Sequence, residues 1–241
     1  MARTPGSTDQ APALPGEGPL VLVMDVDSTL IRDEVIELIA EHAGTREEVA
    51  AVTEAAMRGE LDFAQSLHAR VATLEGLPVE VLDRVRAAVR LTPGARTLVT
   101  TLVESGHTVG LVSGGFTEVV DDLASELGIA HARANHLEIV DGRLTGKVLG
   151  DVVDRAAKAE FVIRLAAASG IEMDRTVAVG DGANDLDMMA AAQLGIAFCA
   201  KPAVREQADV SIDEPDLRRV LDILSIDPLP QPDDEGGHPL A

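Results

Sequence analysis

Short apolar runs rich in β-branched residues alternate along most of the chain with longer segments whose apolar residues recur at helical spacing. This alternation predicts an α/β fold, in which a parallel sheet lies between layers of helices. The predicted strands cover residues 20–26, 108–113, 176–180, 195–198 and 209–212. The predicted helices cover residues 94–105, 116–127, 156–169, 185–192 and 215–223. An Asp141-Gly142 turn between HLEIV and RLTG predicts a β-hairpin in addition.

Residues 33–90 interrupt this alternation, because several helical patterns follow one another there without an intervening strand. The segment predicts a small helical bundle inserted after the first strand, which we interpret as a cap over one edge of the sheet. The core domain then comprises residues 19–32 and 91–226. The Pro- and Gly-rich ends, 1–18 and 227–241, are expected to be a disordered leader and a disordered tail.

The composition excludes several classes of partner. Of the 241 residues, 41 are Asp or Glu and 20 are Lys or Arg, and the net charge of −21 disfavours nucleic acid and anionic membranes. Aromatic residues, at 2%, are too few for a platform that stacks bases. No apolar run approaches the roughly 20 residues of a membrane-spanning helix. The single cysteine, Cys199, excludes an internal disulfide and is expected to be buried and inert, so we expect a soluble, cytoplasmic protein.

Acidic residues and glycines gather directly after three of the predicted strands, where an open parallel sheet binds its ligands. The three segments are DVDST from Asp25, SGG from Ser113 and GDGAND from Gly180. Asp25 and Asp27 are two positions apart, so in an extended chain their carboxylates lie on one side and repel each other. A hard divalent cation such as Mg²⁺ relieves that repulsion, and Asp181 or Asp185 would complete its ligands.

Each of these patterns also has a purely structural interpretation. An isolated DxD is often an Asx turn, although a calcium loop is excluded because Leu30 and Ile36 occupy the positions that need Gly and Glu. Ser113 either caps the helix that follows it or, with its glycines, offers a phosphate free N–H groups. Lys158 is a candidate phosphate contact or an ordinary solvated charge. The sequence has no P-loop, dinucleotide-binding or serine-hydrolase motif.

Together DVDSTL, SGG, the region of Lys158 and GDGANDLDMM resemble the four signature segments of the haloacid dehalogenase superfamily of phosphatases. The insert, with EVIELIAEHAG and EAAMRGELDFAQSLHARVATLEGLP, is more specific and resembles the members of that family that hydrolyse phosphoserine, over residues 21–224. The resemblance implies a Rossmann-like, three-layer core with a helical cap. It also implies Mg²⁺-dependent hydrolysis of O-phospho-L-serine, the last step of L-serine biosynthesis. Because only a short leader precedes the resembling region, no amino-terminal regulatory domain is expected.

The resemblance further implies a role for each matching residue. Asp25 is the expected nucleophile, Asp27 the general acid and then base, and Lys158 a charge partner. Magnesium would be held by Asp25, Asp181 and the backbone carbonyl of Asp27, with Asp185 binding through water or as support. The residues expected to contact the substrate are Glu34, Met57, Phe63, Arg70, Ser113, Gly114, Lys158 and Asn184.

Among these, Glu34 would bind the substrate's ammonium and Arg70 its carboxylate, while Met57 and Phe63 would form the wall of the pocket. Without the resemblance, Met57 and Phe63 are ordinary apolar residues of a bundle, and Arg70 is a base on a helix surface.

Two other functions stay open at this point. The first is a phosphatase or phosphotransferase for another small phosphorylated metabolite such as phosphohomoserine, because Glu34 with Arg70 indicates an amino acid but not its length. The second is a non-catalytic, acidic metal-binding module, against which the presence of Asp25, Asp27 and Lys158 argues. The sequence leaves the choice between monomer and homodimer undecided.

Overall fold

The computed structural model describes residues 18–57 and 62–229. Most of the predicted leader and tail therefore lies outside the described residues, as do the side chains of Met57 and Phe63. The predictions made for them stay predictions.

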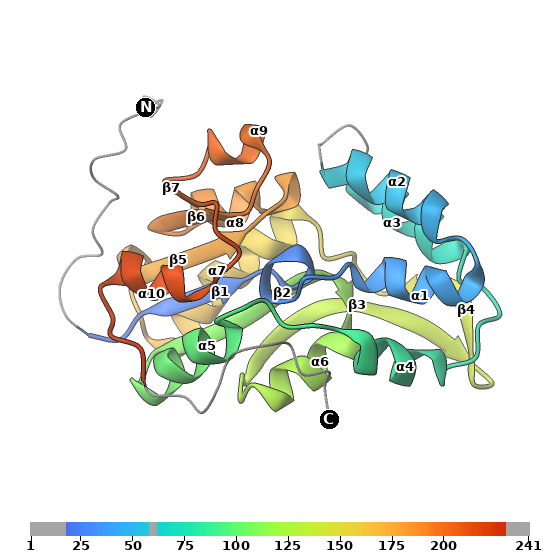
Figure 1. Ribbon diagram of the computed structural model, residues 1–241, viewed down its shortest axis with the longest axis horizontal. Helices are drawn as coiled ribbons and strands as arrows, with labels where there is room; N and C mark the ends of the chain where they lie inside the picture. The colour runs from blue at the N-terminus through green and yellow to red at the C-terminus, as the bar shows by residue number, and fades with distance from the viewer. Residues whose placement is uncertain (1–17, 58–61, 230–241) are drawn as a thin grey trace.

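A single seven-stranded sheet forms the centre of the molecule, in the strand order β4-β3-β2-β1-β5-β6-β7 (Figure 1). Neighbouring strands are parallel throughout, except that β4 runs antiparallel to β3. The strands are β1 (Val21–Met24), β2 (Thr108–Phe116), β3 (His131–Val140), β4 (Arg143–Leu149), β5 (Thr176–Gly180), β6 (Leu194–Phe198) and β7 (Val210–Ile212). The predicted α/β class and the predicted hairpin are confirmed.

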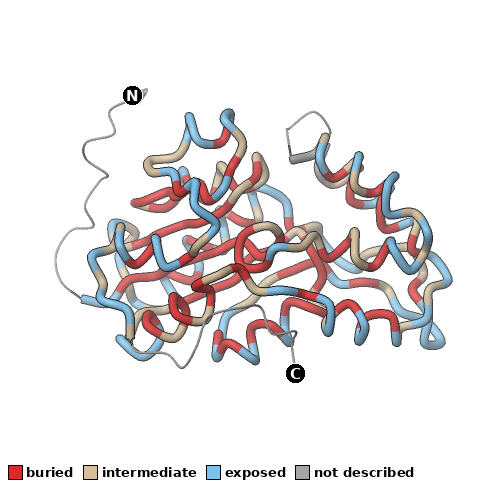
Figure 2. The backbone as a smooth tube through the Cα atoms, in the orientation of Figure 1, coloured by how far each residue is buried: buried red, intermediate tan, exposed pale blue. Residues whose placement is uncertain are grey.

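Helices cover both faces of this sheet. They are α5 (Ala95–Glu104), α6 (Thr117–Glu126), α7 (Arg155–Ser169), α8 (Leu186–Ala191), α9 (Pro202–Arg205) and α10 (Arg218–Leu224). Because strand side chains alternate between faces, Leu22 and Met24 pack into the core that includes α5, α6 and α10. Val21 and Val23 pack into a second core with α7, α8 and α9. Figure 2 shows the buried strands between these more exposed helices, which makes three layers.

Three details of the sheet differ from the prediction. β1 ends at Met24, because the chain turns at Val26–Leu30 (η1), where Ser28 has a left-handed φ of 55°. β2 continues past Ser113 to Phe116, with a shift in its register against β3. β3 begins at His131 and pairs with β2 before it enters the hairpin, so the hairpin extends the main sheet. The sequence did not predict the start of β3, because apolar and polar residues alternate over only a few positions around Ala132 and Ala134.

The insert consists of helices, as its periodicity predicts. They are α1 (Val35–Ala43), α2 (Arg46–Met57), α3 (Phe63–Ala72) and α4 (Val81–Ala88). In α1, Val35, Ile36, Ile39 and Ala40 recur at helical spacing and are all buried. The helix ends at Gly44, whose left-handed φ of 73° suits glycine.

The loop between α3 and α4 rests on the β3–β4 hairpin. Gly76 N–H donates to the carbonyl of Leu144 at 2.8 Å, and Val79 N–H donates to that of Gly142 at 2.9 Å. Figure 1 shows α2 and α3 side by side above the hairpin, away from α5 and α10. No helix within the described ranges is long and apolar enough to span a bilayer.

Candidate active site

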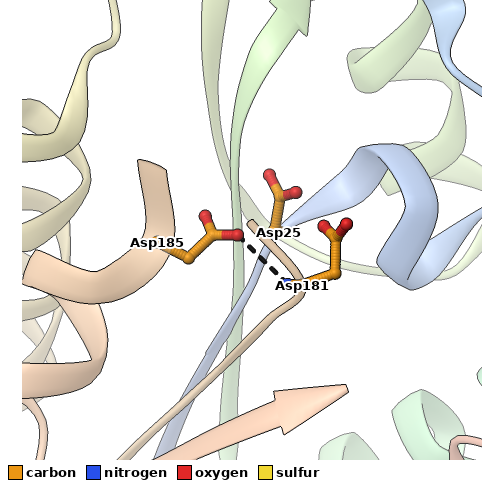
Figure 3. Close-up of side chains that lie close together, drawn as sticks. All are labelled: Asp25, Asp181 and Asp185. Carbon is orange, nitrogen blue, oxygen red and sulfur yellow. Dashed lines mark hydrogen bonds between the residues drawn. The ribbon is translucent and has the colours of Figure 1, made fainter. Parts of the chain in front are cut away.

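The carboxyl ends of β1 and β5 bring three aspartates together. Asp25 directly follows β1, and its N–H donates to the carbonyl of Val179 on β5 at 2.9 Å. Asp181 directly follows β5, and Asp185 closes the short η3 turn (Ala183–Asp185). Carboxylate oxygens of Asp25, Asp181 and Asp185 lie within 4.8 Å of one another (Figure 3). The sequence predicted that Asp25 and Asp27 would lie together and that Asp181 or Asp185 would complete the site. The structure instead groups Asp25 with both Asp181 and Asp185, because β1 ends at Met24 and the chain turns at Val26–Leu30.

Lys158 is the cation of this cluster. It projects from the first turns of α7, where Asp154 caps the helix by accepting a 2.8 Å hydrogen bond from Ala157 N–H. Its Nζ lies 2.6 Å from Asp25 Oδ1 and 2.6 Å from Asp185 Oδ1, and its side chain is fully buried. Burial opposes its charge, but Asp185 and Asp25 outweigh burial and raise the pKa of Lys158. The alternative of a solvated surface lysine is therefore wrong.

The three carboxylates carry more negative charge than Lys158 balances. Asp185 is fully engaged, since its Oδ2 also accepts from the N–H groups of Asp181 at 3.2 Å and Gly182 at 3.0 Å. Burial, together with Asp185, raises the pKa of Asp181 to about 7, and the same causes raise the pKa of Asp25 well above its ordinary value. Clustered aspartate oxygens are the ligands of hard divalent cations. The residues present therefore fit a bound metal ion.

Asp27 is not part of this cluster, and its carboxylate is held by two hydrogen bonds. Its Oδ1 accepts a 2.8 Å hydrogen bond from Val35 N–H, and its Oδ2 accepts one of 3.1 Å from the hydroxyl of Ser113. Burial raises the pKa of Asp27, although these two hydrogen bonds oppose the rise. A Cβ on Gly115 would lie 2.6 Å from Asp27 Oδ2, so glycine is needed for this close approach.

The hydroxyl of Ser113 does not cap α6, which was one of its two predicted roles. It accepts a 2.7 Å hydrogen bond from Gly115 N–H while it donates to Asp27. Phe116 is the N-cap residue of α6, without a side-chain cap. The capping interpretation of Ser113 is therefore wrong, because β2 carries this residue to the end of the sheet instead.

Asn135 on β3 is a residue of this site that the sequence interpretation missed. It is buried, its Nδ2 donates to the carbonyl of Gly114 at 2.8 Å, and its Oδ1 accepts from Val153 N–H at 2.8 Å. It thereby ties the Ser113–Gly115 segment to the segment that leads into α7 and Lys158. Its only signal in the sequence was a polar residue inside a strand, which does not by itself indicate a site.

A pocket opens between this centre and the insert. The residues around it are Asp25, Asp27, Glu34, Ile36, Thr53, Leu67, Arg70, Gly114, Gly115 and Asn184. Four of the eight predicted substrate residues thus border one pocket, namely Glu34, Arg70, Gly114 and Asn184. Ser113 and Lys158 contact Asp27 and Asp25, which border the same pocket. Asn184 Oδ1 is buried and has no hydrogen-bond partner within the described residues. A buried polar atom without a partner is costly, so it indicates the position of a polar ligand.

Glu34 and Arg70 face this pocket from the insert side. Glu34 Oε1 accepts a 2.6 Å hydrogen bond from the Ser28 hydroxyl, and burial, followed by the charge of Asp27, raises the pKa of Glu34 well above its ordinary value. Arg70 is 6% exposed, so its interpretation as a surface base is wrong. Among the described residues, no carboxylate forms an ion pair with it.

Cys199 contradicts its prediction, because it is exposed. It lies just after β6 with a left-handed φ of 47°, and this turn carries the thiol out of the core. A second, more open cleft passes this point, between α2 and the segment after β6, and Asp181 also borders it. Across the cleft, Lys201 Nζ lies 3.6 Å from Glu54 Oε1.

Comparison with known proteins agrees with this geometry. Residues 22–190 match the family model of haloacid dehalogenase-like hydrolases. The chain belongs to this family. The resemblance of its four signature segments is thereby confirmed, and so is the family's fold.

Curated relatives of this haloacid dehalogenase-like hydrolase include two bacterial phosphoserine phosphatases. The one from Streptomyces coelicolor is 64% identical over 206 residues, which cover 86% of this chain but 50% of the relative. The chain therefore spans about half the length of that protein. The one from Streptococcus thermophilus is 55% identical over 204 residues, covering 85% of this chain and 95% of the relative.

Solved structures similar to this hydrolase include two of phosphoserine phosphatase. One is described as a phospho-aspartyl intermediate analogue, with a TM-score of 0.83 and 43% identity over 86% of this chain and 99% of the other. The second is described as a substrate-bound complex, with a TM-score of 0.83 and 42% identity over the same shares of the two chains. The fold similarity thus extends over the insert as well as the core.

Proposed function

We propose that this hydrolase releases phosphate from O-phospho-L-serine and so completes L-serine biosynthesis. One observation carries the proposal: a single pocket joins the Asp25–Lys158 centre to two oppositely charged side chains of the insert, Glu34 and Arg70. A phosphorylated amino acid presents the matching set of groups, namely a phosphate, an ammonium and a carboxylate. The names of the relatives and of the similar structures support the same substrate.

We propose Mg²⁺ as the metal, held by Asp25, Asp181 and the backbone carbonyl of Asp27. Asp185 supports it, because both of its carboxylate oxygens already accept hydrogen bonds. When bound, the ion supplies neutralising charge to the phosphoryl group. The oxygen-only donor set and the excess negative charge of the cluster support this assignment.

Asp25 is the proposed nucleophile. Its carboxylate oxygen forms a bond to phosphorus while the bond between phosphorus and the serine oxygen breaks, which leaves an aspartyl-phosphate and a serine alkoxide. Asp27 donates its proton to that oxygen. Burial supports this role, because it raises the pKa of Asp27 and favours the protonated form needed at the start.

The second half of the reaction uses the same two residues. Asp27, now ionised, accepts a proton from a water molecule whose oxygen attacks phosphorus, and the carboxylate of Asp25 is released together with phosphate. The hydrogen bonds from Val35 N–H and the Ser113 hydroxyl hold Asp27 in place for both steps. Lys158 orients Asp25 through its 2.6 Å contact.

The remaining contacts bind the substrate. Of the three protons on Lys158 Nζ, two point to Asp25 and Asp185, and we assign the third to a phosphoryl oxygen. We assign the other phosphoryl oxygens to Gly114 and to Nδ2 of Asn184, beside Ser113, whose hydroxyl proton goes to Asp27. The orphaned Oδ1 of Asn184 only accepts, so it supports a hydrogen-bond donor at that position. Glu34 takes the ammonium and Arg70 the carboxylate. Met57 and Phe63 remain proposed walls of the pocket.

We also propose that residues 33–90 act as a cap that closes over the substrate bound on the core of residues 19–32 and 91–226. The two clefts between the insert and the strand ends support this division. We propose no nucleic-acid or membrane partner, and a monomer or homodimer as the oligomeric state. We propose the cytoplasm as the compartment, because free cysteines such as Cys199 stay reduced there.

The test is phosphate release from phosphoserine, phosphothreonine, phosphohomoserine and simple sugar phosphates, by the wild type and Asp25→Asn, with Mg²⁺ or with a chelator. We expect phosphoserine to be preferred, and the rate to fall at least about 10³-fold in Asp25→Asn and on chelation. Asp141→Asn, in the exposed hairpin turn, is the matched control and should keep full activity. Preference for another substrate would overturn the roles of Glu34 and Arg70. No turnover of any substrate would overturn the proposed activity and favour the alternative of a non-catalytic metal-binding module.

A further inference from the structure

Thr53 is a buried hydroxyl of the insert that borders the pocket and has no role in the proposed chemistry. It lies on α2, is 4% exposed, and shares the pocket with Arg70 of α3. Its Oγ1 accepts a 2.9 Å hydrogen bond from Arg70 Nη1 and donates one of 2.9 Å to the carbonyl of Val49. A guanidinium only donates, and a hydroxyl has one proton, so the directions of both bonds are fixed.

A second neutral group holds the other side of the guanidinium. Arg70 Nε donates to the carbonyl of Ser66 at 3.1 Å, one turn earlier on α3. The two bonds use two of the five N–H groups of Arg70 and fix the plane of the fork. Neither partner carries a charge, and none of the described carboxylates forms an ion pair with Arg70. The arginine is therefore oriented while its positive charge stays available to a ligand.

We propose that Thr53 is a positioning residue that determines selectivity for substrates with a carboxylate. It holds the Arg70 fork so that the remaining N–H groups meet a planar anion in bidentate fashion. A carboxylate at this position would hold Arg70 equally well but would neutralise it. The inference rests on the proposed function, because it assigns the substrate's carboxylate to Arg70.

The closing experiment compares Thr53→Val, which has the same shape without the hydroxyl, with Thr53→Ser, which keeps it. The substrates are phosphoserine and phosphoethanolamine, which has the same phosphate and ammonium but no carboxylate. For Thr53→Val we expect the KM of phosphoserine to rise about tenfold, as for one lost hydrogen bond to a charged group. Its kcat, and the KM of phosphoethanolamine, should stay within about twofold of the wild type, and Thr53→Ser should restore the KM of phosphoserine.

KM and the ratio of kcat/KM for two substrates do not depend on the amount of folded enzyme, so these two quantities decide the result even where partial unfolding of Thr53→Val lowers the apparent kcat. Thr145→Val, which removes a hydroxyl of the hairpin, is the matched control and should change neither KM. An equal rise for both substrates, or no rise for either, would overturn the role of Thr53. A wild type that turns over phosphoethanolamine as well as phosphoserine would instead overturn the proposed function itself.

Discussion

The core side and the insert side of the pocket each bury one cation, and they hold it in different ways. On the core side, Lys158 contacts two carboxylates at 2.6 Å, those of Asp25 and Asp185. On the insert side, Arg70 is held by the Thr53 hydroxyl and the Ser66 carbonyl, both neutral. The charge of Lys158 is thus compensated by two direct ion pairs, whereas Arg70 has no ion pair among the described residues and meets only the more distant charges of Glu34, Asp27 and Glu37.

This difference separates chemistry from selection. Lys158 belongs to a centre whose ion pairs are already formed in the protein without a substrate, so in the proposed function it would act on whatever phosphate ester enters. In the proposed function Arg70 attracts one particular group of the substrate, and its local positive field would also offset the repulsion between anionic substrates and a chain of net charge −21. Removing each cation should therefore have different consequences for stability, kcat and KM.

The largest effect is expected for Lys158→Met. The variant leaves Asp25 and Asp185 buried without their cation, and breaking a buried ion pair on one side costs about 3–5 kcal/mol of unfolding free energy. We expect the melting temperature to fall most in the presence of a chelator and to recover in part with Mg²⁺, because a bound cation replaces some of the lost charge. Phosphate release should be abolished under both conditions. Thermal denaturation and a phosphate assay measure the two effects.

Lys147→Met is the matched control for this variant. Lys147 is exposed on β4, far from the strand ends that carry the aspartates, so its loss should change neither stability nor activity appreciably. A Lys158→Met protein with the wild-type melting temperature in chelator would contradict the claim that the core cation is needed to compensate the cluster.

A smaller and more selective effect is expected for Arg70→Met. The substitution keeps an apolar stem and removes one hydrogen bond each from the Thr53 hydroxyl, which still donates to Val49, and from the Ser66 carbonyl, so the loss of stability should be well below that of Lys158→Met. We expect the KM of phosphoserine to rise about 10- to 140-fold, the range for a charge-assisted pair of roughly 1.5–3 kcal/mol. The value of kcat should change much less. Steady-state kinetics with phosphoserine measure both.

Phosphoethanolamine supplies the control for Arg70→Met, since its KM should not respond to the loss of a carboxylate-binding residue. If kcat falls as far as in Lys158→Met while KM stays unchanged, the insert cation takes part in phosphoryl transfer, and the division between the two sides is wrong.

The sequence predicted the core side better than the insert side. DVDST, SGG and GDGAND lie at strand ends, and because parallel strands end at one edge, their convergence followed from the predicted topology. The pairing of Lys158 with Asp25, 133 residues away, did not follow, because helical periodicity does not tell which face of α7 meets the sheet. The helices of the insert were predicted correctly, because helical periodicity is a local feature of the sequence.

What the sequence missed depends on long-range contacts or on local backbone geometry. Thr53 and Asn135 are ordinary polar residues whose importance comes from hydrogen bonds to other parts of the chain, those of Thr53 with Arg70 and those of Asn135 with Gly114 and Val153. Cys199 was predicted to be buried from its apolar neighbours, but a left-handed turn after β6 exposes it. Neither kind of information is present in periodicity or composition.

The smallest effect concerns the scaffold, at the opposite end of β1 from the aspartates. His107 Nδ1 accepts a 3.2 Å hydrogen bond from Leu20 N–H, and burial, with the nearby charge of Arg175, lowers the pKa of His107. The folded protein thus prefers the neutral ring. Its contribution to stability is complete above the unfolded pKa of about 6.5 and is lost as the pH falls through the lower folded value.

We expect His107→Asn, whose amide oxygen also accepts a hydrogen bond but does not titrate, to lose less stability than the wild type between about pH 7 and pH 5. Chemical denaturation at several pH values measures the difference, and replacement of the exposed His131 by Asn is the control. Equal acid slopes in the wild type and His107→Asn would show that His107 is not responsible.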